Sequence, residues 1–149
     1  MATMWQITVD CAEPGRLADF WVTALGYVRE PPPPGHDSWG TWFATYGVPE
    51  EEWDDGASII DPAGAAPKIG FLKVPEGKVA KNRLHLDVLV NGSRADWRPE
   101  DQEERTARVR ATVATLLAAG GSVVAEDHWQ GNLDHVVMAD PEGNEFCVR

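Results

Sequence analysis

Four side chains in this sequence could take part in chemistry: Gln6, His85, Asp87 and Cys147. His85 and Asp87 stand two residues apart in an alternating segment, so on a strand both side chains would point to the same face. An imidazole beside a carboxylate can act as a general base or bind a ligand hydroxyl, which makes this pair the catalytic candidates. His85 is equally well explained as a hydrogen-bonded histidine at the edge of a core, and both interpretations stay open.

Gln6 and Cys147 allow a similar choice. The Gln6 amide could hold a ligand carbonyl or satisfy a neighbouring backbone group. Cys147 would need a nearby base and a lowered pKa to act as a nucleophile, whereas a buried cysteine usually serves as a small apolar core residue. Two cysteines in 149 residues are too few for a disulfide framework. We therefore expect a reducing, cytoplasmic environment.

The segments that carry these side chains are repeated along the chain. The turn sequence Asp61-Pro62-Ala63-Gly64 recurs as Asp140-Pro141-Glu142-Gly143, an offset of 140 − 61 = 79 residues. The same offset takes Gln6 to His85, and strand-like segments at 5–10 and 84–89 surround those two residues. A turn that matches together with a strand indicates a duplicated module.

Each half also carries one amphipathic helix after its first strand. Leu17, Phe20 and Trp21 begin an apolar stripe that predicts a helix over 14–25. A second stripe from Val109 to Leu117 predicts a helix near 100–119, after a polar, acidic insertion at about 91–104. Strand-like runs follow each helix, at 57–60 and 68–73 in the first half and at 122–125, 135–138 and 145–148 in the second.

The pattern therefore predicts an α+β protein made of two tandem βαβββ modules, with eight strands in two four-stranded sheets. The modules cover about 1–75 and 82–149, and together they form one domain over 1–149. Each sheet would leave one face uncovered by helix, so we expect the two faces to form one cupped mixed sheet around a small-molecule pocket.

The first module also contains an aromatic insertion. Four prolines at 31–34 precede Trp39, Trp42, Phe43 and Tyr46, which fall at i, i+3, i+4 and i+7 and predict a short amphipathic helix. These rings either anchor the insertion to the sheet or, with Trp53, form a wall of the pocket that stacks on a flat ligand. The two roles are compatible. We expect Trp39 and Trp42 to divide these roles, one anchoring the insertion and the other touching the ligand.

Three stretches resemble the vicinal-oxygen-chelate superfamily, which includes glyoxalase and bleomycin-resistance proteins. They run from Gln6 through Glu13–Trp21 to Tyr27, from Lys81 to Asp87, and from Asp140 to Cys147. The last two are similar to a glyoxalase-like subgroup. The resemblance implies the glyoxalase/bleomycin resistance/dioxygenase fold but does not choose among isomerases, dioxygenases, thiol transferases and drug-binding proteins.

The resemblance also implies where a metal would bind. Metalloenzymes of this superfamily use a His or Gln on the first strand of each module and a Glu on the last. Gln6 and His85 match the first-strand positions, but the carboxylate positions fall on Cys147 and within 68–71, where no residue is a plausible ligand. We therefore expect no metal and no other cofactor, with Gln6, His85 and Cys147 as vestigial ligand positions.

The net charge of −11 disfavours partners that are nucleic acids or anionic membranes. We expect a cytoplasmic homodimer that binds or sequesters an aromatic or polycyclic compound without metal, in drug resistance or a natural-product pathway. The expected ligand-binding residues are Gln6, Trp39, Trp42, Phe43, Trp53, His85 and Cys147. The alternatives are a lyase, isomerase or dioxygenase that uses Gln6 and His85, with or without a divalent metal, and a domain whose pocket has lost its role.

Overall fold

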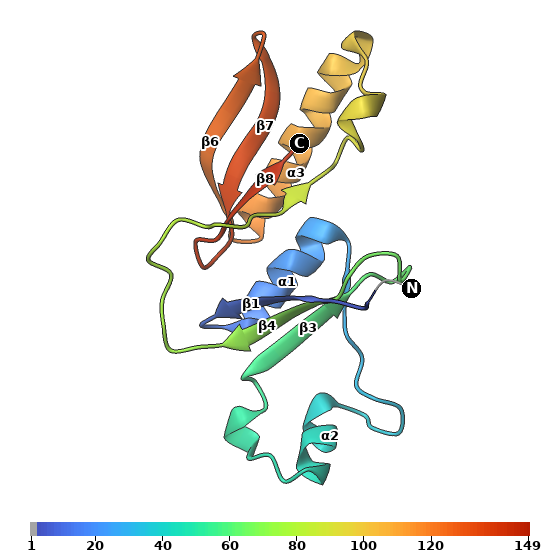
Figure 1. Cartoon of the computed structure of the whole chain (residues 1–149), viewed down its shortest axis with the longest axis vertical. Coiled ribbons are helices and arrows are strands. Elements are labelled where there is room, and N and C mark those ends of the chain that lie inside the picture. Colours follow the sequence, from blue (N-terminus) through green and yellow to red (C-terminus); the bar gives the residue numbers. More distant parts are fainter. Residues whose placement is uncertain (1–2) are drawn as a thin grey trace. The chain divides into compact units, whose positions relative to one another are not determined.

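The computed structural model of the chain describes residues 3–149, apart from the side chain of Asp96. The chain divides into two compact units: the residues up to Val22 together with Gly26–Gly77, and Thr23–Leu25 together with Lys78–Arg149. Each unit contains one four-stranded mixed sheet (Figure 1). No helix of the described residues is both long enough and apolar enough to span a membrane.

The first unit carries the N-terminal module. Its elements are β1 (Ile7–Cys11), α1 (Pro14–Leu25), β2 (Val28–Arg29), α2 (Trp39–Thr45), a 3-10 turn (Glu50–Glu52), β3 (Gly56–Ile60) and β4 (Ile69–Lys73). The strand order is β1-β4-β3-β2, in which β1 and β4 are parallel and the other pairs are antiparallel.

The second unit repeats this topology. Its elements are β5 (Asp87–Val88), two 3-10 turns (Arg94–Asp96 and Pro99–Asp101), α3 (Gln102–Ala118), β6 (Ser122–Trp129), β7 (Asn132–Ala139) and β8 (Glu145–Val148). The order β5-β8-β7-β6 again places the first strand parallel to the last. The predicted pair of βαβββ modules is confirmed.

The pairing within each sheet also tests the predicted repeat. Thr8 pairs with Gly70 in the first sheet, and Asp87 pairs with Cys147 in the second. Gln6 lies two residues before Thr8, and His85 lies two residues before Asp87. The two residues therefore occupy equivalent positions, each just before the first strand of its module, as the 79-residue offset predicts.

The helices form where the apolar stripes predict them. α1 buries Leu17, Phe20 and Trp21, starts at Pro14, and ends at Gly26, whose left-handed backbone (φ 68°) is strained for other residues. α3 buries Val109, Val113 and Leu116. Leu117, included in the predicted stripe, is instead 46% exposed and lies outside the buried face of α3.

Alternation along the strands determines which face of the second sheet is the core. Val136, Met138, Phe146 and Val148 are fully buried, and α3 packs against β7 and β8 on this face. Cys147 and His135 alternate with them and point to the other face. The predicted strand at 84–89 is correct only in part: β5 is two residues long and Leu84 is 89% exposed, so it does not pack beneath the helix.

The Asp-Pro-x-Gly turns are held by their first residue. The buried Asp140 carboxylate accepts hydrogen bonds from the backbone N–H groups of Glu142 (3.0 Å) and Asn144 (2.9 Å) and from the Asn144 side-chain amide. Asp61 accepts from the N–H groups of Ala63, Ala65 and Ala66, and these bonds lower the pKa of its carboxyl.

Replacing Asp140 should therefore destabilise the protein more than replacing its repeat equivalent. We expect Asp140→Ala to lower the free energy of unfolding by about 2–3 kcal/mol, because it removes a buried acceptor and leaves several donors of a half-buried turn without a partner. Asp61→Ala should cost less, since water reaches the donors of that exposed turn. Urea unfolding of both variants measures the difference, and equal losses would contradict this account.

Candidate functional site

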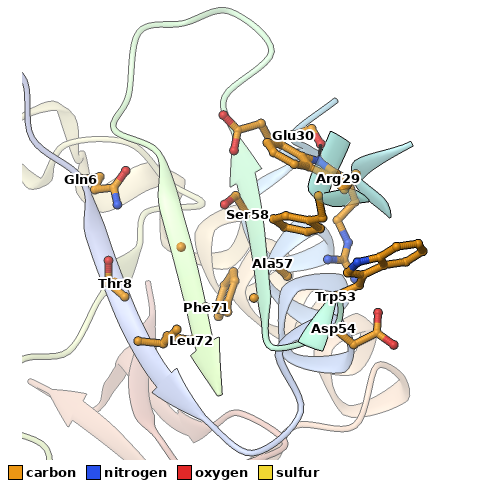
Figure 2. Close-up of a pocket in the computed structure, with 14 residues that line it drawn as sticks. Gln6, Thr8, Arg29, Glu30, Trp53, Asp54, Ala57, Ser58, Phe71 and Leu72 are labelled. Carbon is orange, nitrogen blue, oxygen red and sulfur yellow. Dashed lines mark hydrogen bonds between the residues drawn. The ribbon is translucent and has the colours of Figure 1, made fainter. Parts of the chain in front are cut away.

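The first unit contains a pocket of about 430 Å³ on the face of its sheet opposite α1. Figure 2 shows its floor, where alternate residues of adjacent strands carry Thr8 on β1, Leu72 on β4 and Ser58 on β3. Aromatic residues of the insertion line it from the side. The lining residues are Gln6, Thr8, Arg29, Glu30, Trp39, Phe43, Trp53, Asp54, Gly56, Ala57, Ser58, Gly70, Phe71 and Leu72.

The open space above the floor depends on Gly70. This residue pairs with Thr8 in the centre of the sheet, and a Cβ atom placed on it would point at the Thr8 hydroxyl (3.6 Å) and the Gln6 amide (3.9 Å). Any side chain at position 70 would therefore project into the pocket. Glycine is costly within a strand, and here it leaves a hollow lined by an amide and a hydroxyl.

The aromatic side of the pocket is built by local capping and two indole hydrogen bonds. The Ser38 hydroxyl accepts from the Thr41 N–H (3.1 Å) and starts α2. The Trp39 indole N–H donates to the Glu30 carbonyl (2.9 Å), and the Trp53 indole N–H donates to the Val48 carbonyl (3.1 Å). Both rings are thereby held in place by their polar edges, while ring surface remains available to the pocket.

The Trp53 ring also fits closely against α2. A Cβ atom added to Gly40 would lie 2.6 Å from Cε3 of Trp53, so only glycine allows the ring to approach the helix this closely. Trp42, in contrast, does not line the pocket. Its ring contacts Trp39 (5.5 Å between centroids) and Tyr46 (4.8 Å) and supports the aromatic cluster.

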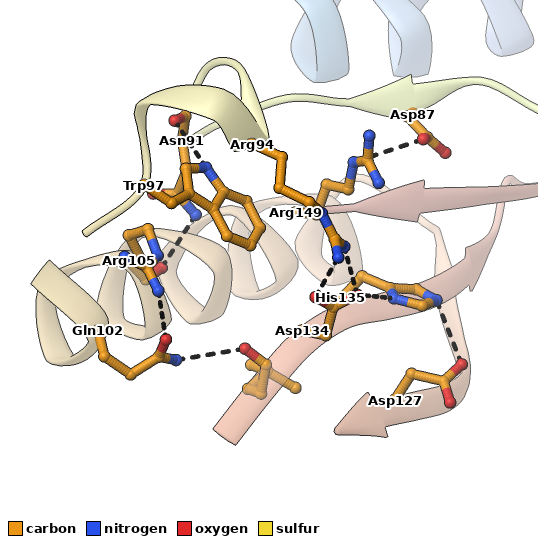
Figure 3. Close-up of polar contacts among 11 residues, drawn as sticks. Asp87, Asn91, Arg94, Trp97, Gln102, Arg105, Asp127, Asp134, His135 and Arg149 are labelled. Atoms are coloured by element: carbon orange, nitrogen blue, oxygen red, sulfur yellow. Dashed lines mark hydrogen bonds and ion pairs between the residues drawn. The ribbon is translucent and has the colours of Figure 1, made fainter. Parts of the chain in front are cut away.

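The second unit brings together His85, Asp87 and Cys147, whose ligand atoms lie within 4.8 Å of one another. His85 Nε2 is 3.4 Å from Asp87 Oδ1, and Arg149 Nε is 3.4 Å from Asp87 Oδ2. Figure 3 shows the Arg149–Asp87 pair. The geometry thus places the predicted catalytic pair side by side, with the thiol of Cys147 on the same face.

The Cys147 thiol is held in its protonated form. Burial raises its pKa, and the neighbouring Asp87 carboxylate, which also accepts a hydrogen bond from it, raises the pKa further; Arg149 opposes this weakly. A thiolate nucleophile needs the opposite environment. The cluster could instead chelate a thiophilic cation, since imidazole, carboxylate and thiolate are all zinc ligands and a bound cation would deprotonate the thiol.

The sequence-predicted site residues therefore fall into two groups. Gln6, Trp39, Phe43 and Trp53 meet in the pocket of the first unit, whereas His85 and Cys147 meet in the second. Trp42 lies outside the lining. Sequence reasoning missed Thr8, Glu30 and Ser58; alternation from Gln6 indicates Thr8, but the other two become neighbours only through strand pairing.

The chain matches the family model of the glyoxalase-like domain over residues 6–149 and belongs to that family. This family is part of the vicinal-oxygen-chelate superfamily, as the sequence motifs suggest. No curated protein sequence matches the chain significantly.

Several solved structures are similar. One is a glyoxalase/bleomycin resistance protein/dioxygenase family enzyme from Burkholderia phytofirmans PsJN, with TM-score 0.61, 13% identity, and coverage of 99% of this chain and 97% of that one. The hypothetical protein SA1046 from S. aureus has TM-score 0.57 and 16% identity, covering 99% and 96%.

A third similar structure is a mutant of the fosfomycin resistance protein FosX from Listeria monocytogenes, complexed with Mn(II) and 1S,2S-dihydroxypropylphosphonic acid. It has TM-score 0.54 and 12% identity, and the match covers 100% of this chain and 90% of FosX. At these identities the likeness shows the fold alone.

Strand register tests whether this chain fits the metal site of the superfamily. Strand pairing sets Gly70 beside Thr8 and Cys147 beside Asp87, so neither of these last-strand positions holds a carboxylate. In the first unit Gln6 offers an amide, and in the second unit His85, Asp87 and Cys147 offer an imidazole, a carboxylate and a thiol. Neither set, with at most one carboxylate, fits a hard cation such as Mn(II), which prefers carboxylate oxygens.

The environment of Cys147 predicts slow alkylation. We expect iodoacetamide to modify Cys147 slowly at pH 8, because its thiol is protonated and buried. Asp87→Asn should accelerate the reaction roughly three- to tenfold, since it removes the charge that opposes the thiolate. Peptide mass mapping separates Cys147 from Cys11, which is also buried and serves as the internal control. An unchanged rate at Cys147 would show that Asp87 does not control the thiol.

Proposed function

We propose that this chain is a small-molecule-binding protein of the glyoxalase/bleomycin-resistance type, which holds a planar aromatic compound in the pocket of its first unit without a metal. The observation that carries the proposal is the pocket itself. Its volume of about 430 Å³ suits a drug-sized ligand, and it combines Trp39, Phe43 and Trp53 with a few polar groups.

The polar groups define the ligand further. Gln6, Thr8 and Ser58 offer an amide and two hydroxyls, which can donate to or accept from a carbonyl, hydroxyl or amine on the ligand. Glu30 is paired with Lys68 (2.6 Å), and Asp54 also lines the pocket. With a net charge of −11, the protein attracts cations at long range, so a neutral or cationic aromatic compound is favoured over an anion.

The proposed biochemical role is sequestration of the ligand, in drug resistance or in a natural-product pathway. The protein would act as a homodimer in the cytoplasm, and dimer formation is open to a direct check by light scattering. The similar FosX mutant is complexed with Mn(II) and 1S,2S-dihydroxypropylphosphonic acid. The present chain would share its fold while using stacking instead of metal chelation, because carboxylates are lacking at both equivalent last-strand positions.

A metal-dependent enzyme is the second candidate, favoured by the cluster of His85, Asp87 and Cys147. The two proposals differ in an observable way. Under the metal-free proposal we expect elemental analysis of the purified protein to show no stoichiometric Zn, Fe, Mn or Ni. One bound ion per chain that is lost in His85→Ala would reject the metal-free proposal and support the enzyme.

Filling the pocket tests the ligand site directly. We expect Gly70→Val to weaken binding of aromatic compounds at least tenfold, about 1.4 kcal/mol, because the new side chain occupies the space above the sheet. The fold should survive, since valine suits a strand and its Cβ meets only ordinary contacts. Ligands come from a calorimetric screen of planar neutral and cationic compounds, from naphthylmethanol to acridine dyes.

Two variants serve as controls for this experiment. Gly77→Ala adds a methyl group at an exposed position outside the pocket lining, where no atom lies within 4 Å of the new Cβ, and should leave affinity unchanged. Trp42→Ala removes a ring that supports the aromatic cluster without lining the pocket, so it should lower the melting temperature more than the affinity. If Gly70→Val binds as tightly as the unmodified protein, the ligand site lies elsewhere and the proposal fails.

A further inference from the structure

A second pocket, which we call the arginine–tryptophan pocket, lies in the second unit. It has a volume of about 360 Å³ and is formed between the tip of the β6–β7 hairpin and the insertion that precedes α3. Its characteristic lining residues are Arg94, Trp97, Arg98, Arg105, Trp129 and Asp134. Three of the thirteen basic residues of a strongly acidic chain thus gather around one hollow.

Trp97 organises the pocket. The guanidinium of Arg94 lies 5.1 Å from the centre of its ring and that of Arg105 lies 4.7 Å from it, so two cations contact the same aromatic system. The Trp97 indole N–H donates to the Asn91 carbonyl (3.3 Å). Figure 3 shows these side chains converging beside the N-terminal part of α3. The insertion is therefore ordered by specific contacts at this site.

The positive charge of the pocket is only partly neutralised. Asp134 accepts two hydrogen bonds from Arg94 (2.7 and 2.8 Å). Burial would raise the pKa of Asp134, but hydrogen bonds from His135 and Arg94 outweigh it and lower the pKa, so this carboxylate is fully charged at neutral pH. Arg105 donates to the Arg98 carbonyl and to the Gln102 side chain, both uncharged. Among the side chains that the structure describes, no carboxylate pairs with Arg98 or Arg105.

The hairpin tip supplies an exposed ring. β6 and β7 are joined by Gln130 and Gly131, both with positive φ (51° and 80°), as in a tight two-residue turn. Trp129, the last residue of β6, is 65% exposed and lines the pocket. A large ring exposed in this way at a hairpin tip contributes little to the stability of the fold. It offers a surface on which a flat ligand can stack.

The arginine–tryptophan pocket is separate from the His85–Asp87–Cys147 cluster. Asp134 lies two residues before the buried Val136 on β7, so it is on the same, α3-covered face of the sheet. Cys147 pairs with Val137 and lies on the opposite face. The two groups of residues therefore face different sides of the same sheet and can act independently.

We propose that the arginine–tryptophan pocket is a second binding site, selective for a planar aromatic anion. The guanidinium groups of Arg98 and Arg105 would hold the anionic group, and Trp129 would stack on the ring. Arginine suits this role because its planar fork binds carboxylates and similar anions with directed hydrogen bonds. The site thus prefers the charge opposite to that favoured by the pocket of the first unit.

The test is calorimetric titration of the full-length chain with 2-naphthoate, compared with the neutral 2-naphthylmethanol in the Gly70→Val variant, whose first-unit pocket is filled. We expect naphthoate to bind at least tenfold more tightly than the alcohol and to weaken as salt concentration rises. Arg98→Gln and Trp129→Ala, both exposed positions whose replacement spares the fold, should each weaken naphthoate binding at least fivefold. Arg16→Gln is the matched control, because it makes the same charge change at an exposed residue of the first unit.

Titration of Gly70→Val distinguishes the two pockets. Naphthoate binding should persist in this variant, even though ligands of the first-unit pocket bind more weakly. Three results would each overturn the proposal: loss of naphthoate binding in Gly70→Val, equal naphthoate affinity of Arg98→Gln and the unmodified protein, or equal binding of naphthoate and the alcohol by Gly70→Val.

Discussion

The parallel pairing of the first and last strand of each module is the interaction on which the rest of the structure depends. A parallel pair cannot be closed by a tight turn, so each module must place a helix and two further strands between the paired segments. This pairing sets Thr8 beside Gly70 and Asp87 beside Cys147. Residues separated by about sixty positions in the chain thereby become neighbours on one face of a sheet, where chemistry or binding can take place.

Because the two modules share this strand pairing, the residue at the same last-strand position can be compared between them. In the first module the last-strand position is Gly70, and its missing side chain leaves space for a ligand. In the second module it is Cys147, whose side chain occupies the position and is held by Asp87. One sheet therefore presents a hollow beside an amide, and the other presents a compact polar cluster. The two modules share one frame and differ in the residue at this position.

Much of the frame could be predicted from sequence. The repeated Asp-Pro-x-Gly turn and the 79-residue offset identified Gln6 and His85 as equivalent, and the apolar stripes located α1 and α3 within a few residues. These features are local or periodic, so they can be seen without knowing the fold. The length of the β6–β7 hairpin was underestimated, because Gln130-Gly131 is not a common signal for a tight turn, although both residues adopt positive φ.

The composition of the sites was harder to predict. The spacing of Trp39 and Trp42 places both on one helix face, but only the structure shows that Trp39 reaches the pocket while Trp42 packs against Tyr46. Gly70 gave no signal at all, since a residue without a side chain matters there only through what its absence leaves open. From the sequence alone, the polar insertion before α3 is predicted to be a solvated loop. The stacking of Arg94 and Arg105 on Trp97 could not be predicted, because the proximity of these residues depends on how the insertion folds back.

The charge distribution connects these observations. A protein with a net charge of −11 repels anions at long range, so an anion can be held only where cations are concentrated and partly shielded from the rest of the surface. The insertion before α3 meets this requirement by stacking two guanidinium groups on one indole and using Asp134 to fix a single one of them. The first unit needs no such arrangement, because its pocket is lined mainly by rings, hydroxyls and acidic groups, and its lining cation Arg29 is paired with Asp19. One chain can therefore contain two pockets that favour ligands of opposite charge, provided that local contacts hold the cations of the anion-binding pocket in place.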